Sequence, residues 1–277
     1  FLASQPQFDN QPWLKFIQGN VRDFAIPDQK FDLFIHAATE TSMAAHADCL
    51  NMFDDIVLGT RRVMQLARST GAKRGLLVSS GSVYGQQPFD VTHQHDESRI
   101  ACNPLTPASA YGEGKRVMEL MGAILQAESG IECVSARCFA FCGPGLPLDA
   151  HFAIGNFVRD ALNGTTILVQ GDGSAMRSYL YGADLAIWLL FLLVKGLGGQ
   201  SYNIGSDEAI SIEALAYRVR DILSPQLAVE IRGTEFDKKT TRNSSVPSIA
   251  RARAIGCRPW TSLNESLVFT EQYHRIS

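Results

Sequence analysis

The sequence lacks several features that place a protein in a specialised class. Its 277 residues contain no basic block, and 25 Lys and Arg against 28 Asp and Glu give a net charge of −3. That balance argues against a nucleic-acid partner bound through charge. The longest apolar run, 185–194, falls short of the roughly 20 residues that a membrane helix requires. We therefore expect a core helix there and no membrane partner.

Metal and disulfide patterns are also scarce. The six cysteines have no paired short spacing, which indicates reduced thiols in a cytoplasmic protein. His93 and His95 precede an Asp and a Glu, but no second cluster completes a metal site, so a solvated loop is expected. There is no internal repeat or low-complexity segment. A composition of 45% hydrophobic and 19% charged residues predicts a folded protein with a sizeable core.

The sequence does contain an alternation of strands and helices. Apolar runs predict four strands, at 14–19, 31–38, 75–80 and 131–141. Apolar residues at helical spacing, together with end signals, predict three helices, at 49–67, 107–129 and 211–223. Gly71 and Gly130 follow the first two helices as stops, and Thr106-Pro107 supplies an N-cap and a first-turn proline.

Continuously apolar strands separated by long helices indicate a parallel sheet that is covered on both faces. Open sheets of this kind bind ligands at the carboxyl ends of their strands. We predict an α/β fold with a sheet domain at 1–144 and a smaller α/β lobe at 145–277. The lobe is expected to interleave with the sheet domain around 171–205.

One short motif carries chemistry. Tyr111 and Lys115 are four positions apart in YGEGK, which places both on one face of a helix. Because a nearby ammonium favours the phenolate, we expect the pKa of Tyr111 to fall from its usual ~10 toward a value suited to proton transfer. Gly112 and Gly114 are expected to leave room for a cofactor or substrate to approach the helix.

Ser80 strengthens this motif because it ends a predicted buried strand, at the ligand-binding edge of the sheet. A serine hydroxyl, a phenol and an ammonium can together bind a carbinol, remove its proton and hold the phenolate. These are the groups required for hydride transfer to a nicotinamide. The alternative is that Ser79 and Ser80 only form the turn after the strand.

These motifs together resemble the extended short-chain dehydrogenases/reductases, and among them the NAD-dependent nucleotide-sugar epimerase/dehydratase family. The resemblance covers nearly the whole chain. It rests on FDLFIHAA at 31–38, GTRRVMQLAR at 59–68, LLVSSGSVYG at 76–85, YGEGK at 111–115, RCFAFCGPG at 137–145, NFVRDALNG at 156–164, GDGSAMRSYLYGADLA at 171–186 and YNIGS at 202–206. It implies a Rossmann-type domain at 1–144 that binds NAD, with NADP not excluded, and a nucleotide-diphosphate sugar as substrate.

The resemblance also implies roles for individual residues. Tyr111 would be the catalytic base, Lys115 its partner and a ribose ligand, and Ser80 the hydroxyl that orients the sugar. The residues implied to lie against the cofactor, besides Tyr111 and Lys115, are Asn20, Val21, Ala37, Ala38 and Ser79. The residues implied to contact the nucleotide sugar are Ser82, Asn156, Phe157, Arg177 and Arg242. A guanidinium such as that of Arg177 suits a diphosphate because it pairs two oxygens at once, although a surface charge is the alternative.

Departures from the family pattern narrow the reaction. Dehydrating members commonly carry an Asp-Glu pair after the catalytic hydroxyl residue, where this chain has Gly81 and Ser82. Neither residue can transfer a proton near neutral pH. Ala140 and Ile56 replace two asparagines usual in the family, which leaves the substrate pose open. We expect an epimerase that acts through a transient 4-keto sugar in polysaccharide precursor synthesis. The alternatives are an NAD(P)H-dependent 4-keto-6-deoxy-sugar reductase, a 4,6-dehydratase and a non-catalytic NAD-sensing protein.

Two further expectations concern the start of the chain and its assembly. The chain begins at Phe1, and no G-x-x-G-x-x-G turn precedes FDLFIHAA, although a Rossmann domain seats the pyrophosphate on such a turn. We expect a strand, a helix and a second strand, about thirty to forty residues, to be lacking, and NAD affinity to be poor without them. The resemblance also implies a possible homodimer in which the two long helices pair into a four-helix bundle, and Met52, Val63, Met118 and Met121 serve either that interface or the core.

Overall fold

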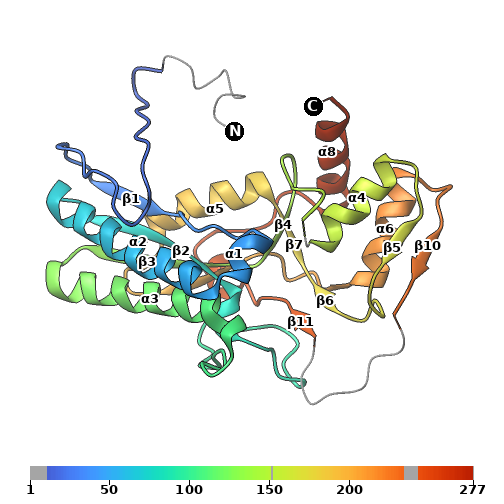
Figure 1. Ribbon diagram of the computed structural model, residues 1–277, viewed down its shortest axis with the longest axis horizontal. Coiled ribbons are helices and arrows are strands. Elements are labelled where there is room, and N and C mark those ends of the chain that lie inside the picture. Colours follow the sequence, from blue (N-terminus) through green and yellow to red (C-terminus); the bar gives the residue numbers. More distant parts are fainter. Residues whose placement is uncertain (1–10, 151, 234–242, 277) are drawn as a thin grey trace.

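The computed structural model describes residues 11–150, 152–233 and 243–276. Its centre is a parallel sheet of four strands in the order β1-β2-β3-β8 (Figure 1). These strands are β1 (Leu33–His36), β2 (Arg74–Ser80), β3 (Glu132–Cys138) and β8 (Ser201–Ile204). Because all pairings are parallel, the strands end at one edge, where Ser80 is the register partner of Cys138. The predicted parallel sheet is confirmed.

Two long helices cover one face of this sheet. Helices α2 (Cys49–Thr70) and α3 (Ala110–Ser129) lie side by side in Figure 1 and share one apolar core with β1 and β2. Both end at a glycine in the left-handed region, with φ of 75° at Gly71 and 68° at Gly130. The predicted stops are confirmed. The residues that lie in this core, rather than at the surface, include Met52, Val63 and Met118.

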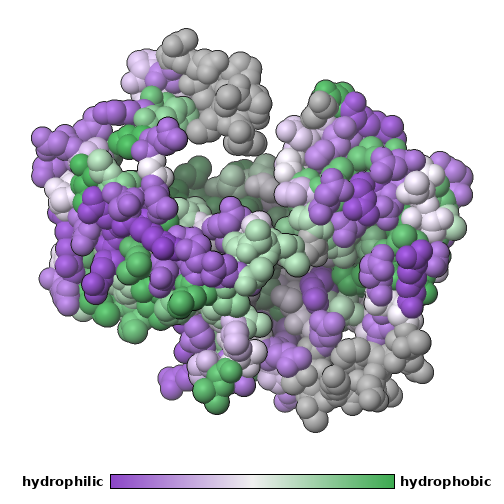
Figure 2. Space-filling view, in the orientation of Figure 1, coloured by the Kyte–Doolittle hydropathy of each residue, from purple (hydrophilic) through white to green (hydrophobic). Residues whose placement is uncertain are grey.

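Helix α5 (Gly182–Lys195) covers the opposite face and contains the apolar run at 185–194. Its Trp188 and Leu192 are fully buried against β2 and β3. Figure 2 shows a hollow at the upper centre of the molecule, with apolar residues in its depth, where Figure 1 places α5. The described residues contain no helix long and apolar enough to cross a membrane. All six cysteines are free thiols.

The remaining elements form a smaller lobe, at the right in Figure 1. Its helices and main strands are α4 (Ala153–Leu162), α6 (Ile212–Leu223), α8 (Leu263–Ile276), β5 (Ile167–Val169) and β10 (Val229–Ile231). Short strands join it to the sheet domain: β4 (Ala140–Cys142), β6 (Met176–Arg177), β7 (Tyr179–Tyr181), β9 (Ile210–Ser211) and β11 (Ser244–Ser245). The short elements nearer the sheet are α1 (Met43–Ala47), η3 (Gly81–Tyr84), η4 (Pro107–Ser109) and α7 (Ala250–Ala254). The predicted helix at 211–223 is α6, and Ser211 caps it through a bond from the Ala214 amide.

Two predicted strands differ from the structure. Segment 14–19 is not a strand: no described strand pairs with it, and Phe16 and Ile17 are exposed. The run at 131–141 breaks at Phe139, because β4 leaves the main sheet to pair with β7. Strand β1 has only β2 as a described neighbour; its Leu33 and Ile35 are exposed on the side away from α2.

Candidate active site

The predicted catalytic residues converge where β2 ends and α3 begins. Ser80 closes β2, and its Oγ accepts a hydrogen bond of 3.1 Å from the Ser82 amide, which caps the short helix η3. Tyr111 lies in the first turn of α3, close enough to Ser80 for that hydroxyl to favour its ionised form. Lys115 follows one turn later on the same helix face. The fold therefore brings all three side chains to the carboxyl edge of the sheet.

Lys115 is anchored on the ends of two strands. Its side chain is buried, and its Nζ donates to Thr39 Oγ1 and to the Val78 carbonyl, both at 2.8 Å. Burial lowers the pKa of Lys115 to about 8, while neighbouring Cys138 and Glu119 act in the opposite direction. Thr39 was not predicted from the sequence, where its one local signal is its place directly after Ala37-Ala38.

The predicted fall in the pKa of Tyr111 is wrong for this structure. Burial is the largest influence and raises the pKa of Tyr111 above its ordinary value of 10, while the nearby Ser80 side chain opposes that rise. The expectation failed because the ammonium of Lys115 points to Thr39 and Val78, with Nζ 5.7 Å from the centre of the Tyr111 ring. Tyr111 therefore holds its proton at neutral pH.

The glycines of the YGEGK motif serve packing rather than ligand access. A Cβ on Gly112 would clash with Cys102 Sγ and lie 2.6 Å from the Ser82 carbonyl oxygen. A Cβ on Gly114 would lie 3.0 Å from Ile56 Cδ1 on α2. The expectation that these glycines admit a ligand is wrong, because neighbouring parts of the protein already fill that space. They allow α3 to pack closely against η3 and α2.

The residues predicted to touch the cofactor lie in three places. Ala37 and Ala38 are exposed at the end of β1, beside the Thr39 that binds Lys115. Asn20 and Val21 lie near α2: Asn20 Oδ1 accepts a bond from the Arg22 amide, and Val21 packs against Gly59. Ser79 is buried, and its Oγ donates to Glu119 at 2.6 Å. Of these predicted residues, only Ala37, Ala38 and Ser79 lie next to residues that contact or act on Lys115.

Arg177 lies on β6, in the short sheet between the two parts of the protein. Its guanidinium donates to the Met176 carbonyl at 2.8 Å and to Asn243 Oδ1 at 3.3 Å, and it has no carboxylate partner among the described residues. Burial lowers its pKa. Ser178 follows Arg177 directly, and Ser244 lies on the paired strand β11. Their buried hydroxyls have no hydrogen-bond partner among the described residues. Ser244 pairs in register with Met176, so Ser244 and Ser178 alternate with Arg177 and lie on the other face of this short sheet.

The other residues predicted to contact the sugar nucleotide are less accessible to a ligand. Phe157 is 2% exposed and belongs to the core of the smaller lobe, so its side chain is closed to a ligand. The Asn156 amide, with its nitrogen toward the loop, donates to the carbonyls of Leu148 and Ala150. Ser82 is exposed, with its hydroxyl 3.2 Å from Ser80 Oγ. Arg242 lies outside the described residues.

Two residues next to this centre were not predicted from the sequence. The ring of His46, on α1, lies edge-on to Tyr111 with centroids 5.4 Å apart. Cys138 lies across from Ser80 on β3 and interacts electrostatically with Tyr111 and Lys115. No sequence pattern pointed to either residue, because both contacts arise between elements that are distant in the chain.

Comparison with known structures and sequences defines the class of protein. A UDP-glucose 4-epimerase from Thermotoga maritima superimposes with a TM-score of 0.75 and 22% identity, over 88% of this chain and 77% of that one. A dTDP-glucose 4,6-dehydratase from Bacillus anthracis, in complex with NAD, gives 0.80 and 17% over 100% and 84%. At these identities the likeness establishes the Rossmann-type α/β fold.

The sequence comparisons give the family. The profile of the NAD dependent epimerase/dehydratase family matches residues 2–205, and the chain belongs to this family. UDP-glucuronic acid decarboxylase 3 of Arabidopsis thaliana is 32% identical over 222 residues, which are 79% of this chain. The matched region spans 63% of that relative's length.

Proposed function

We propose that this chain carries the catalytic centre of an NAD-dependent enzyme that epimerises a nucleotide-diphosphate sugar through a transient 4-keto intermediate. The observation that carries this proposal is the convergence of Ser80, Tyr111 and Lys115 at the carboxyl ends of β1 and β2. Membership of the NAD dependent epimerase/dehydratase family supports it.

The described residues fit the nicotinamide-ribose side of a dinucleotide. Lys115 presents a buried ammonium at the strand ends, and the exposed Ala37 and Ala38 lie next to its anchor Thr39. We propose that Lys115 and Thr39 bind ribose hydroxyls there. A bound NAD supplies an acceptor that takes a hydride from the sugar and returns it; NADP is the alternative cofactor.

Three side chains of this protein would handle the sugar oxygen. Tyr111, as phenolate, takes the proton of the sugar hydroxyl while the hydride leaves the same carbon, which becomes a ketone. Ser80 holds that oxygen through its hydroxyl, and the ammonium of Lys115 stabilises the phenolate electrostatically. Return of the hydride to the opposite face, with the proton given back by Tyr111, yields the epimer. Because burial raises the pKa of Tyr111, the resting protein holds the phenol, which must lose its proton before Tyr111 can act as the base.

Arg177 is proposed to bind the diphosphate. A guanidinium without a carboxylate partner among the described residues can form the charge-assisted hydrogen bonds that phosphate oxygens accept. We propose that Asn156 and the main chain of Phe157, on α4, border the nucleotide, and that Ser82 borders the sugar. Arg242 stays a prediction from the sequence alone.

The residues after Ser80 disfavour dehydration. Loss of water from the keto sugar requires an acid and a base, and Gly81 and Ser82 supply neither. A side chain at position 81 would also begin 2.9 Å from the Phe139 ring. An Asp there would therefore require that ring to move.

Decarboxylation is the second candidate, because the relative from Arabidopsis thaliana is a UDP-glucuronic acid decarboxylase. Oxidation at C4 of a uronic acid creates a β-keto acid, which releases carbon dioxide without a dedicated pair of carboxylates. The same Ser80, Tyr111 and Lys115 would serve that oxidation and the later reduction.

A substrate panel separates these candidates. The encoded protein is incubated with NAD and, in turn, UDP-glucose, UDP-galactose and UDP-glucuronic acid, and the products are followed by NMR. Epimerisation predicts interconversion of the first two sugars, with deuterium placed at C4 retained in the product. Release of carbon dioxide from the third sugar alone would favour decarboxylation. Stoichiometric consumption of NADPH with a keto sugar would favour the reductase instead.

We also propose a homodimer. The exposed residues of α2 and α3 include four large apolar side chains: Leu50, Leu58, Leu120 and Ile124. Such a face suits the predicted four-helix bundle. The mass of the protein in solution by light scattering tests it.

A further inference from the structure

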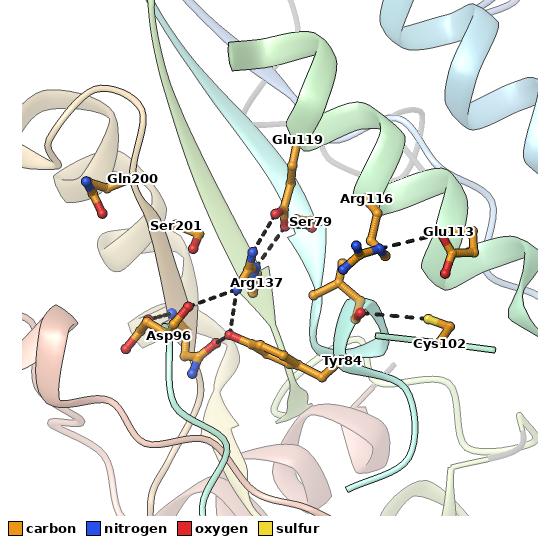
Figure 3. A network of polar contacts seen from close by, with 12 residues as sticks. Ser79, Tyr84, Asp96, Cys102, Glu113, Arg116, Glu119, Arg137, Gln200 and Ser201 are labelled. Atoms are coloured by element: carbon orange, nitrogen blue, oxygen red, sulfur yellow. Dashed lines mark hydrogen bonds and ion pairs between the residues drawn. The ribbon is translucent and has the colours of Figure 1, made fainter. Parts of the chain in front are cut away.

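A buried ion pair lies beneath the helix that carries Tyr111 and Lys115 (Figure 3). Glu119 reaches from α3 to Arg137 on β3, and the guanidinium donates to both carboxylate oxygens, at 2.9 Å and 2.6 Å. The two side chains are only 15% and 14% exposed. A buried pair of charges is tolerated where its geometry is good and its other hydrogen-bonding groups are satisfied.

Both members of the pair make further bonds to the elements around Ser80. Glu119 Oε1 accepts from Ser79 Oγ at 2.6 Å, and Ser79 directly precedes Ser80 on β2. Arg137 Nη1 donates to the Tyr84 hydroxyl at 2.8 Å and to the Asp96 carbonyl at 3.1 Å. Tyr84 ends η3, the turn that begins after Ser80. The pair therefore joins α3 to both sides of Ser80.

Glu119 also acts electrostatically on Lys115. It follows Lys115 by four positions and Tyr111 by eight, so the three side chains share one face of α3. The titratable and charged groups that act on Lys115 or contact it come from three elements: His36 on β1, Tyr111 and Glu119 on α3, and Cys138 on β3. Burial lowers the pKa of His36 to about 4 and raises that of Cys138 to about 12, so both are neutral at pH 7. Glu119 is thus the anionic member of this set.

We propose that Glu119 is a positioning residue of the catalytic centre. Together with Arg137 it fixes α3 on the strand ends that carry Ser80, and its carboxylate sustains the positive charge on Lys115. That the centre is catalytic rests on the proposed function; the effect of Glu119 on Lys115 does not. A purely structural ion pair would hold the helix without altering the protonation of Lys115.

The test measures the pKa of Lys115 directly, by NMR of the protein labelled with ε-13C lysine. The chain has seven lysines, and the signal that disappears in Lys115→Met identifies Lys115. Glu119→Gln removes a negative charge and should lower the pKa of Lys115 by about 0.5 or more. Arg137→Gln removes a positive charge and should raise it. Glu113→Gln is the matched control, since Glu113 lies on the same helix but pairs with Arg116.

Opposite shifts in Glu119→Gln and Arg137→Gln, with none in Glu113→Gln, support the proposal. Circular dichroism checks that each variant is folded; where one variant does not fold, the expected shift in the other is sufficient. A folded Glu119→Gln protein whose Lys115 titrates as in the wild type overturns the proposal. Failure of both variants to fold also overturns it, because it assigns the pair to folding alone. The titration of Lys115 needs no substrate, so its result does not depend on the outcome of the substrate panel.

Discussion

The ammonium of Lys115 lies 5.7 Å from the centre of the Tyr111 ring and is hydrogen-bonded elsewhere, to Thr39 and Val78. Both groups are desolvated, so burial raises the pKa of Tyr111 and lowers that of Lys115. The two therefore favour their neutral forms more than they would in water. The lysine acts on the phenol through space, and its position is set by strand ends rather than by the tyrosine.

Lys115 should make the stability of the protein depend on pH. Its pKa is about 8 in the folded protein against an ordinary value of 10.5, so the unfolded chain binds the proton more tightly. The wild type should therefore gain about 3 kcal/mol relative to Lys115→Met as pH rises from about 8 to 10.5. Below pH 8 the difference should be constant.

Urea unfolding of both proteins across this range measures that difference. The other six lysines titrate in both proteins and cancel. Parallel stability curves for the wild type and Lys115→Met would show that Lys115 titrates in the folded protein as it does in water.

Gly112→Ala should destabilise the protein by about 1–3 kcal/mol, because the added methyl group would clash with Cys102 and crowd the Ser82 carbonyl. Thermal or urea unfolding measures the effect. Gly171→Ala is the matched control, since a Cβ at Gly171 meets no atom within 4 Å. Equal stability of the two variants would contradict the packing role assigned to Gly112.

Arg177→Gln should weaken the binding of UDP by about tenfold or more, because a charge-assisted hydrogen bond to phosphate is lost. Titration calorimetry with UDP measures this without a sugar or a turnover step. Arg218→Gln serves as the control, since Arg218 is exposed and pairs with Glu208 on the surface. If the Arg177 variant binds UDP as tightly as the control does, the diphosphate lies elsewhere.

Local signals in the sequence predicted much of this architecture, and long-range contacts account for what they missed. The stops at Gly71 and Gly130 and the shared helix face of Tyr111 and Lys115 depend on neighbours within a few positions. The strand predicted at 14–19 failed because a strand requires a pairing partner, which its own residues cannot reveal.

The residues of the centre were easier to predict from the sequence than their contacts and pKa values. Thr39 contacts Lys115 across 76 positions, and Glu119 meets Ser79 across 40. No periodicity or spacing encodes such pairs. The pKa of Tyr111 was misjudged for the same reason, since its burial depends on the assembled fold. The cofactor residues Asn20 and Val21 and the domain boundary at 144 stay predictions.

The most direct test of the central claim compares Tyr111→Phe with Tyr217→Phe in the encoded protein supplied with NAD and the sugar nucleotide that it converts. Tyr217 lies on α6 beside Arg220, outside the proposed centre. Loss of the Tyr111 hydroxyl should reduce turnover by at least about a hundredfold, while Tyr217→Phe should turn over as the wild type does. Wild-type turnover by a folded Tyr111→Phe protein would contradict the catalytic assignment.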